Sequence, residues 1–273
     1  MNKKSFGNKP LSCPYAVWAA IFIIVPLFIM FYFALTDANG VFTLSNLASL
    51  GRYKKAFAIS IVYAAISTVI TLILAYPMAY FMTKLKISSQ RMIMLIVMLP
   101  MWTNFLIRTY SWITILANTG IINTLLGKLG IGPLKLINTP CAVILGMVYD
   151  FIPYMILPIY TTISKIDDSL LEAAGDLGSN AFSKIKRVIL PLSIPGVLSG
   201  ITMVFVPSIS TFYISQKLGN GMILLVGDII ETQFKIPNYE LGAAMSLVLM
   251  ILIIISTAIM NKFGDSDKGG IMI

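Results

Sequence analysis

Apolar residues along this chain form six long, nearly uninterrupted blocks that are separated by shorter polar stretches. A helix needs about 20 apolar residues to cross the hydrocarbon core of a bilayer. Each block is too long for a strand of a globular protein and too apolar for a surface helix. The blocks are Tyr15–Leu35, Ala58–Thr83, Met92–Ile115, Cys141–Ser164, Leu190–Tyr213 and Leu241–Asn261. The pattern predicts an all-α polytopic protein with six transmembrane helices, in which residues 1–273 form a single transmembrane domain.

The first block has an alternative interpretation as the apolar part of a signal peptide, because Lys3, Lys4 and Lys9 precede it. Its apolar run is longer than such a region usually is, and no small-residue cleavage site follows it. We therefore expect a permanent first helix.

Composition supports the membrane assignment. Hydrophobic residues make up 58% of the 273 residues and charged residues only 11%, whereas a soluble domain carries about 25% charged residues. The formal net charge is +9, but the basic residues mostly flank apolar blocks, which favours an anionic lipid surface over nucleic acid as the partner. The chain has no histidine, which removes imidazole metal ligands and Ser-His or Cys-His nucleophile pairs. The sequence therefore offers no convincing set of catalytic residues for a membrane-embedded enzyme.

The distribution of basic residues predicts the orientation. Six spans place both termini on one side, and the side that holds the termini carries twelve Lys and Arg against seven on the other. Cytoplasmic loops carry the excess of positive charge, so we expect both termini in the cytoplasm of a bacterial inner membrane. The cluster Arg52–Lys55 argues locally against this orientation, but the N-terminal lysines and the Lys84–Arg91 loop outweigh it.

The longest cytoplasmic connection, Lys165–Ile189, carries eight of the 31 charged residues, four of each sign. Ser169 followed by Glu172 predicts a capping box at the start of a helix over Leu170–Leu177. Gly178 is suited to the left-handed conformation that ends such a helix. The loop therefore predicts a short helix in water beneath the bundle.

A second short helix is expected directly afterwards, because Asn180 is a favourable N-cap. This helix is expected to run towards Pro191 and to carry Lys184, Lys186 and Arg187 in its last turns, where the helix dipole favours cations. The first helix presents the small residues Ala173 and Ala174, which let another protein approach closely. The alternative is an ordinary amphipathic loop helix.

The spacing of residues in this loop resembles the EAA loop of binding-protein-dependent ABC importer permeases. The resemblance rests on Glu172-Ala173-Ala174, Gly178, Val188 and Leu190-Pro191, with valine at position 188 where the motif usually has isoleucine. It implies that residues 165–189 are a cytoplasmic coupling loop whose helix sits in a cleft of a separate ATPase. Glu172, Ala173, Ala174 and Gly178 would then transmit nucleotide-driven closure to the transmembrane helices.

The resemblance also implies the partners. They are a homologous second permease subunit, two ATP-binding subunits and an extracellular substrate-binding protein. The chain lacks a phosphate-binding loop, since Gly127-Lys128 is followed by Leu129 and not by the Ser or Thr that would hold magnesium. We therefore expect a non-catalytic subunit without a cofactor, with ATP and Mg²⁺ bound by the partner ATPase.

Three stretches resemble the first permease subunit of spermidine/putrescine importers, namely Pro100–Tyr110, Val148–Tyr160 and Leu190–Gly196. A polyamine is a flexible polycation, and its path would use aromatic faces and a few carboxylates. Asp150 is the only acidic residue deep inside a predicted span, and Tyr154 follows it by one turn on the same face. The candidate substrate-path residues are Trp102, Tyr110, Asp150, Tyr154 and Tyr213.

Structural alternatives stay open for these residues. Arg108 and Asp150 are expected at similar depth and could simply pair with each other. Asn104 lies one turn before Arg108, which also fits a hydrogen-bonded seam between helices. Aromatic residues near span ends could belong to the interfacial belt.

The external loop Ile214–Glu240 contains an apolar stretch, Met222–Ile230, that is too short to span. We expect a partly inserted helix there, near the outer gate, and the resemblance implies that this face meets the extracellular binding protein. A merely solvated loop is the alternative.

Two other functions compete with a polyamine permease. An ABC permease for another solute, such as an amino acid, thiamine, sulfate or iron, would share every feature of the coupling loop. A secondary transporter driven by an ion gradient would need intramembrane carboxylates or internal repeats, and the sequence offers one such carboxylate and no clear repeat.

Overall fold

The computed structural model describes residues 17–266, and the N-terminal lysines and Tyr15 lie outside this range. Five helical stretches are long and apolar enough to cross a membrane, and a bent pair of helices makes up to six. The all-α class is thus confirmed for these residues, and the predicted number of six spans is reached when the bent pair is counted as one span. The α-helices are α2 (Val25–Ala34), α3 (Ser45–Ser49), α4 (Lys54–Thr83), α5 (Ile87–Trp102), α6 (Phe105–Leu116), α7 (Ile121–Lys128), α8 (Pro140–Ile163), α9 (Asp168–Asp176), α10 (Ala181–Lys184), α11 (Leu190–Ser210), α12 (Tyr213–Gly219), α13 (Val226–Lys235) and α14 (Tyr239–Ser266).

Residues 17–266 fold as two compact units, one made of residues 17–54 together with Ile229–Leu252, and the other of Lys55–Asp228 and residues 253–266. The first unit has a small core of Ala34, Ala243, Ala244 and Leu247. The second unit contains every candidate site residue named above.

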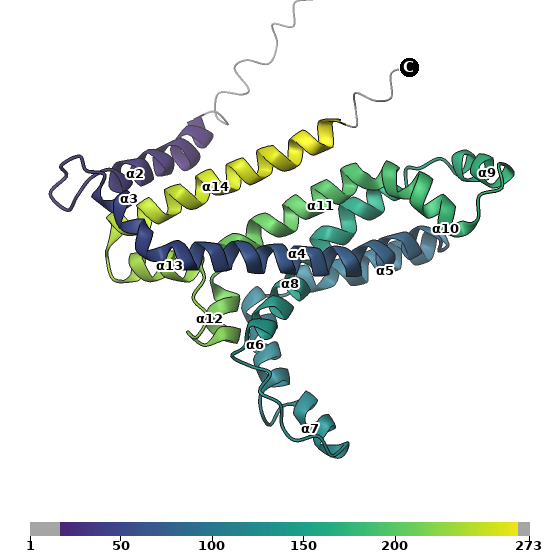
Figure 1. Cartoon of the computed structure of the whole chain (residues 1–273), viewed down its shortest axis with the longest axis horizontal. Helices are drawn as coiled ribbons and strands as arrows, with labels where there is room; N and C mark the ends of the chain where they lie inside the picture. Colours follow the sequence, from purple (N-terminus) through teal and green to yellow (C-terminus); the bar gives the residue numbers. More distant parts are fainter. Residues whose placement is uncertain (1–16, 267–273) are drawn as a thin grey trace, which may run out of the picture. The chain divides into compact units, whose positions relative to one another are not determined.

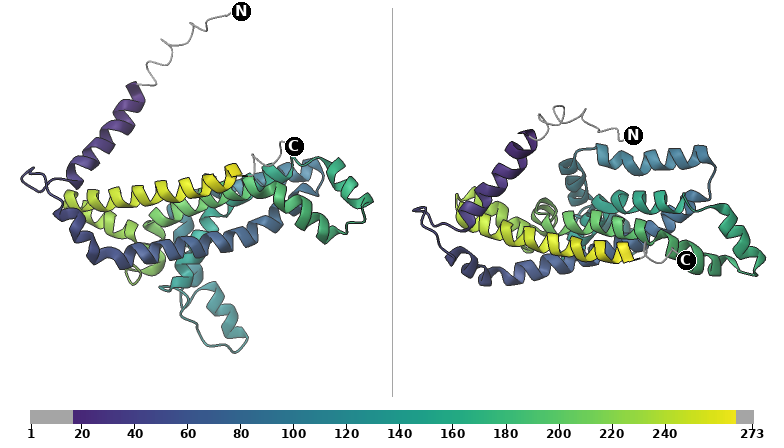
Figure 2. Two further views of the ribbon diagram at one scale, coloured as in Figure 1. Left: turned by 45° about the horizontal axis from the view of Figure 1, so that its top comes forward. Right: turned by 90° about the horizontal axis from the view of Figure 1, so that it is seen from above.

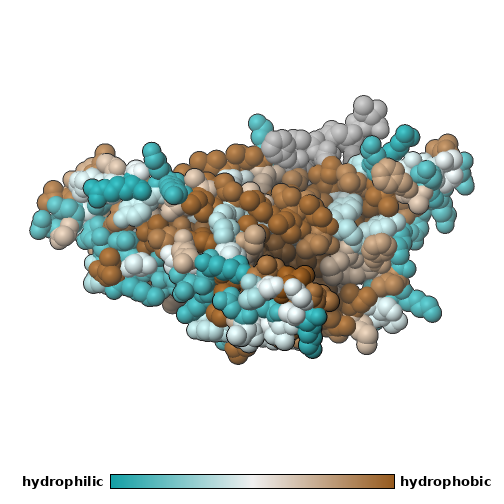
Figure 3. Space-filling view, turned by 60° about the horizontal axis from the view of Figure 1, so that its bottom comes forward, coloured by the Kyte–Doolittle hydropathy of each residue, from teal (hydrophilic) through white to brown (hydrophobic). Residues whose placement is uncertain are grey.

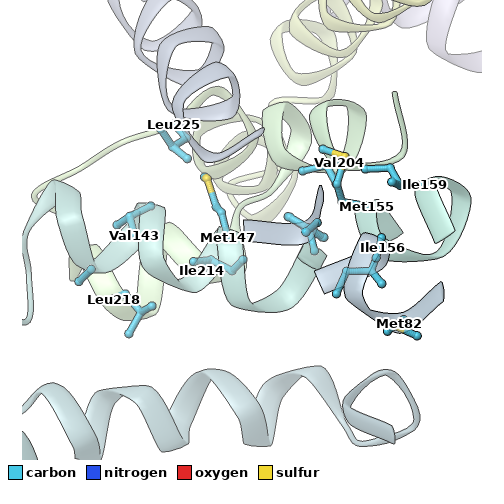
Figure 4. Packing of buried hydrophobic residues seen from close by; sticks show 14 of the residues in the cluster. Met82, Val143, Met147, Met155, Ile156, Ile159, Val204, Ile214, Leu218 and Leu225 are labelled. Atoms are coloured by element: carbon cyan, nitrogen blue, oxygen red, sulfur yellow. The ribbon is translucent and has the colours of Figure 1, made fainter. Parts of the chain in front are cut away.

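Helix α8 is the centre of the second unit. It packs along α11 and also contacts α5, α6 and α12. In its most apolar stretch, 61% of the residues are buried. Its side chains, including Met147, Met155 and Ile159, interdigitate with residues of the neighbouring helices (Figure 4). Glycines allow this close approach, because a Cβ added at Gly146 would lie 2.6 Å from Leu218 and one at Gly200 would lie 2.6 Å from the Met155 sulfur. Small residues at such positions are typical of helix packing in membranes.

Helix α4 carries small residues on its buried face and large apolar residues on its exposed face. The buried residues recur at helical spacing and are Ser60, Ala64, Ser67, Thr71 and Ala75. The exposed ones follow the same spacing on the opposite face and are Val62, Ile66, Val69 and Ile73. This is the reverse of a soluble helix, and it fits a helix whose outer face meets lipid. The space-filling view likewise shows a broad hydrophobic surface (Figure 3).

The third apolar block is not one helix, so the prediction of a single helix over Met92–Ile115 is wrong. It is divided into α5 and α6, and α5 makes an angle of 92° with the stretch Phe105–Lys128. Thr103 and Asn104 are extended, and the Asn104 side chain accepts a hydrogen bond from the backbone N–H of Leu106 at 2.8 Å. Asn104 is therefore the N-cap of α6 and not part of a seam between helices.

The segment after α11, which the sequence predicts to be external, contains two short helices, α12 and α13. The helix expected over Met222–Ile230 begins only at Val226 and continues to Lys235 as α13. Leu225, Val226 and Asp228 are buried, and Asp228 accepts a hydrogen bond from the backbone N–H of Leu225 at 2.8 Å. This start of α13 is folded into the protein, so a merely solvated loop is excluded here.

Candidate functional site

The predicted coupling segment connects α8 to α11 and lies at one end of the second unit, where α9 and α10 form a compact turn (Figures 1 and 2). Its helix α9 spans Asp168–Asp176, close to the predicted Leu170–Leu177. In the space-filling view this end of the chain carries hydrophilic side chains, in contrast to the hydrophobic surface beside it (Figure 3).

The predicted capping box at the start of α9 is wrong. Asp167 is the N-cap, and its carboxylate accepts a hydrogen bond from the backbone N–H of Ser169 at 3.0 Å. Ser169 lies inside the helix, so its hydroxyl does not cap the first turn. The hydrogen bond from Ser169 holds the pKa of the Asp167 carboxyl below its ordinary value. The helix begins two residues earlier than predicted because an aspartate also satisfies the free amides of a first turn and favours the dipole.

The turn between α9 and α10 confirms two predictions. Gly178 has a φ of +81°, and the N–H of Ser179 donates to the Ala174 carbonyl at 3.0 Å while the N–H of Gly178 donates to Gly175 at 2.8 Å. These two bonds are the Schellman pattern that closes a helix through a left-handed residue. Asn180 then caps α10 by accepting a hydrogen bond from the Ser183 N–H at 2.8 Å.

The second helix does not end near Pro191, contrary to the prediction. After α10 the chain forms a π-helical turn over Ile185–Ile189 and continues directly into α11, so one helical run covers residues 181–210. A π-turn leaves room for a proline that lacks an N–H and would clash with a tighter turn. Lys186 and Arg187 therefore lie in the π-helical turn, inside a continuous helix, and not at a helix end. Lys184 instead reaches α9, where its ammonium would lie 2.7 Å from a Cβ added at Gly175.

The exposed face of the coupling segment is more apolar than its charges suggest. Glu172, Ala173 and Gly178 are exposed and Ala174 is half-buried. Leu177 and Phe182 are 87% and 72% exposed. The other face is anchored, because Leu171 packs against the hydrophobic core. Leu177 and Phe182 were missed in the sequence, although large apolar residues within so charged a loop are a signal for a docking surface.

A cavity of about 320 Å³ lies where the start of α9 meets the α4–α5 turn and the end of α8. Its lining includes Lys84, Gln90 and Asp168. The Tyr160 hydroxyl of α8 donates to the Gln90 side-chain oxygen at 2.8 Å, and the Gln90 amide donates to the Leu85 carbonyl at 2.8 Å. These bonds tie the α4–α5 turn to α8 beside the coupling segment.

Arg108 and Asp150 form a buried ion pair between α6 and α8, as the pairing alternative predicted. Their Nη1 and Oδ1 atoms are 3.2 Å apart, and the side chains are 12% and 3% exposed. The contact is close enough for an ion pair but too poorly aligned for a hydrogen bond, and Arg108 Nε has no hydrogen-bond partner within residues 17–266. Asp150 is thus compensated by one cation, and removal of either partner would leave a buried charge alone.

The aromatic candidates divide into two groups. Tyr110 of α6 and Tyr213 of α12 lie together, with ring centroids 6.5 Å apart. Phe105 lies 5.8 Å from Tyr213 and also 5.7 Å from the Arg108 guanidinium, which links this pair of rings to Asp150.

The remaining two candidates are elsewhere. Trp102 is 77% exposed at the end of α5, and Tyr154 is exposed and packs beside Phe151 at a centroid distance of 6.3 Å. Of the five predicted path residues, the structure therefore brings together Tyr110, Tyr213 and Asp150. Within residues 17–266, no group of three His, Cys, Asp or Glu residues could hold a metal ion.

Comparison with known proteins gives consistent results. A family model described as binding-protein-dependent transport system inner membrane component matches residues 67–266. The spermidine/putrescine transport system permease protein PotB of Haemophilus influenzae is 38% identical over 246 residues, which is 86% of each chain. The protein of the same name from Escherichia coli K12 is 36% identical over 246 residues, covering 86% of this chain and 90% of that protein.

Solved structures agree on the fold. The crystal structure of a bacterial ABC transporter involved in the import of the acidic polysaccharide alginate matches with a TM-score of 0.81, covering 94% of both chains at 14% identity. The alginate transporter in complex with an alginate pentasaccharide-bound periplasmic protein matches with a TM-score of 0.80, covering 93% of this chain and 92% of that one.

Proposed function

Because the chain belongs to the family of binding-protein-dependent transport system inner membrane components, we propose that it is the permease subunit of an ATP-driven importer of spermidine or putrescine. The observation that carries the proposal is the similarity, over most of the chain, to two permeases named for transport of these polyamines. The alginate transporters share the fold at low identity, so the fold alone leaves the substrate open. The substrate class rests on the sequence similarity and on the chemistry of the path.

The proposed assembly pairs this chain with a homologous second permease, two ATP-binding subunits and an extracellular binding protein. The family description includes a binding protein, and a transporter of the same fold has been solved with a periplasmic protein. ATP and Mg²⁺ are bound by the ATPase, because the sequence offers no phosphate-binding loop. Both termini lie in the cytoplasm, which places α9 and α10 on the ATPase side.

The coupling segment is proposed to dock in the ATPase through Glu172, Ala173, Ala174 and Gly178. The support is their exposure or half-exposure beside the apolar side chains of Leu177 and Phe182. A protein surface that covered these apolar groups would remove them from water.

The proposed substrate path runs past Tyr110 and Tyr213, whose ring faces suit cationic amines. Asp150 contributes negative charge behind them, although Arg108 offsets much of it. Trp102 and Tyr154 are exposed and remain proposed path residues that a contact with the second permease would enclose.

Uptake by the purified complex tests this function. The permease, its second permease and the ATPase are reconstituted in proteoliposomes, and uptake of labelled putrescine is measured with the binding protein and ATP. We expect uptake that requires ATP hydrolysis, and unlabelled spermidine should compete with it.

Two results would contradict the proposal, each in favour of one rival. Competition by thiamine, sulfate, iron or an amino acid, without competition by spermidine, would assign the permease to another solute. Uptake that persists without the ATPase and follows an ion gradient would assign it to the secondary transporters.

A further inference from the structure

Lys217 of α12 points its ammonium at two aromatic rings. The Lys217 Nζ atom lies 5.4 Å from the ring centroid of Tyr110 and 5.6 Å from that of Tyr213. Tyr213 and Lys217 are one turn apart on α12 and share a face, and α12 packs against α6, which carries Tyr110. A cation within about 6 Å of an aromatic ring face is attracted by the negative face of the ring.

The ammonium of Lys217 lies against two tyrosine side chains and not against a carboxylate. Arg108 pairs with Asp150 and Lys235 with Glu231, whereas no ion pair to an acidic residue involves Lys217 within residues 17–266. Its neighbour Arg108 also lies over a ring, Phe105, but Arg108 is held by Asp150. Lys217 is therefore the cation that can leave without breaking an ion pair.

The cation site is open on one side. Tyr110 is 51% exposed, whereas Tyr213 and Lys217 are half-buried. A lysine side chain is a flexible four-carbon stem that ends in a primary ammonium. Putrescine has the same four-carbon chain with a primary ammonium at each end, so its chain with one ammonium is chemically like the Lys217 side chain.

We infer that Tyr110 and Tyr213 form a binding site for one primary ammonium of the substrate, and that Lys217 occupies this site until the substrate displaces it. The inference rests on the proposed polyamine function and adds a residue that competes with the substrate. Lys217 keeps the two rings occupied between transport events, and a terminal ammonium of the substrate replaces it one for one. One ammonium replaces another at the rings, and the displaced Lys217 ammonium moves aside.

Because Lys217 and the substrate compete for the same rings, a substitution of Lys217 should change the KM for putrescine only when Tyr110 and Tyr213 are present. A neutral side chain of similar length, Lys217→Met, leaves the site empty and should lower the KM for putrescine by about three- to tenfold, the range of a cation–π contact. Lys217→Arg keeps a cation over the rings and should leave KM near or above the wild-type value.

The experiment measures putrescine uptake by the reconstituted complex with wild type, Lys217→Met and Lys217→Arg, each alone and combined with Tyr110→Leu/Tyr213→Leu. We expect Lys217→Met to lower KM only when both rings are present. Phenylalanine at both positions keeps the ring faces, so Tyr110→Phe/Tyr213→Phe should retain the effect of Lys217→Met.

Several outcomes would overturn the inference. An unchanged KM in Lys217→Met would show that the lysine does not compete. An equal fall of KM with and without the rings would reduce Lys217 to a source of long-range repulsion. Loss of complex assembly in both Lys217→Met and Lys217→Gln, with assembly kept in Lys217→Arg, would make it a structural cation. Wild-type uptake, measured in parallel, separates these results from failure of the proposed function, in which wild type takes up no polyamine.

Discussion

In the α9–α10 segment the candidate residues are exposed, and the hydrogen bonds that present them join residues close in sequence, such as Asp167 with Ser169 and Asn180 with Ser183. Arg108, Asp150 and Tyr213 instead come from three helices far apart in sequence and meet in a largely buried region. The first region exposes apolar side chains, Leu177 and Phe182, which the proposed docking would cover. The second is complete within the chain, and its charges already have partners. Substitutions in the first region should therefore weaken ATPase binding, whereas substitutions in the second should destabilise the permease itself.

The largest expected effect on uptake comes from substitutions at Gly178, in the left-handed turn, and at Glu172, in the helix before that turn. Gly178→Trp places a side chain at a φ of +81°, which strains the turn and obstructs docking, and Glu172→Arg reverses an exposed charge. We expect roughly complete loss of ATP-driven uptake for either change, with the spans still inserted.

Co-purification of the ATPase with the permease measures this effect directly. Gly178→Asn is the matched control, since asparagine tolerates the left-handed conformation, and it should retain most of the bound ATPase. Full uptake by Gly178→Trp would remove the docking role from this segment.

The ion pair should give the next largest effect, on stability. Arg108→Met leaves Asp150 buried without its cation and should lower the free energy of unfolding by about 3–5 kcal/mol. The double variant Arg108→Met/Asp150→Leu removes both charges and should recover most of that loss. The thermal unfolding midpoint of the detergent-solubilised complex is the measurement.

Uptake by the double variant then separates two roles for Asp150. A stable double variant that transports at the wild-type rate would make the pair structural. A stable double variant without uptake would place Asp150 on the path. Equal destabilisation of single and double variants would show that the pair is not the source of the effect.

Leu177 should show a smaller effect that is confined to docking. Leu177→Asp puts a charge on a side chain that is 87% exposed, so the permease itself should stay stable while less ATPase co-purifies. Leu129→Asp is the control, because Leu129 is 75% exposed but follows α7, on the opposite side of the membrane in the proposed orientation. Equal loss of ATPase in both variants would argue against a specific surface at Leu177.

The smallest effect is expected at the N-cap of α9. The pKa of Asp167 is lowered in the folded state, so its contribution to stability is present above its unfolded pKa and is lost as pH falls through the folded value. Asp167→Ala should weaken ATPase binding modestly at neutral pH, while Asp167→Ser keeps a cap. A titration of ATPase binding from neutral to acidic pH should show an extra loss for wild type that is missing in Asp167→Ala.

Sequence reasoning was most successful where local chemistry decides the structure. The left-handed Gly178, the Asn180 cap and the two short helices on either side of them depend on residues a few positions apart, so their signals lie in one short stretch. The N-cap was misassigned because Asp167 and Ser169 both suit that position, and their competition is settled only by the folded chain.

Long-range features were harder to predict. The pairing of Arg108 with Asp150 was anticipated from depth, yet the estimate assumed a straight third helix, which the structure divides at Thr103 and Asn104. Proximity of Tyr110, Tyr213 and Lys217 depends on how α12 returns to α6, and no local pattern encodes that return. Leu177 and Phe182 were visible in the sequence, but their exposure follows from the anchoring of the opposite face of α9.

The uninterrupted helical run over residues 181–210 is a rod about 45 Å long at 1.5 Å per residue. A rotation of about 10° at its α10 end displaces the far end by about 8 Å for a rod of that length. This helix contains no flexible loop that would absorb a displacement of its α10 end. The π-helical turn at Ile185–Ile189 and the internal prolines Pro195 and Pro207 are its irregular points, and stiffness there sets how much of a small tilt reaches the far end.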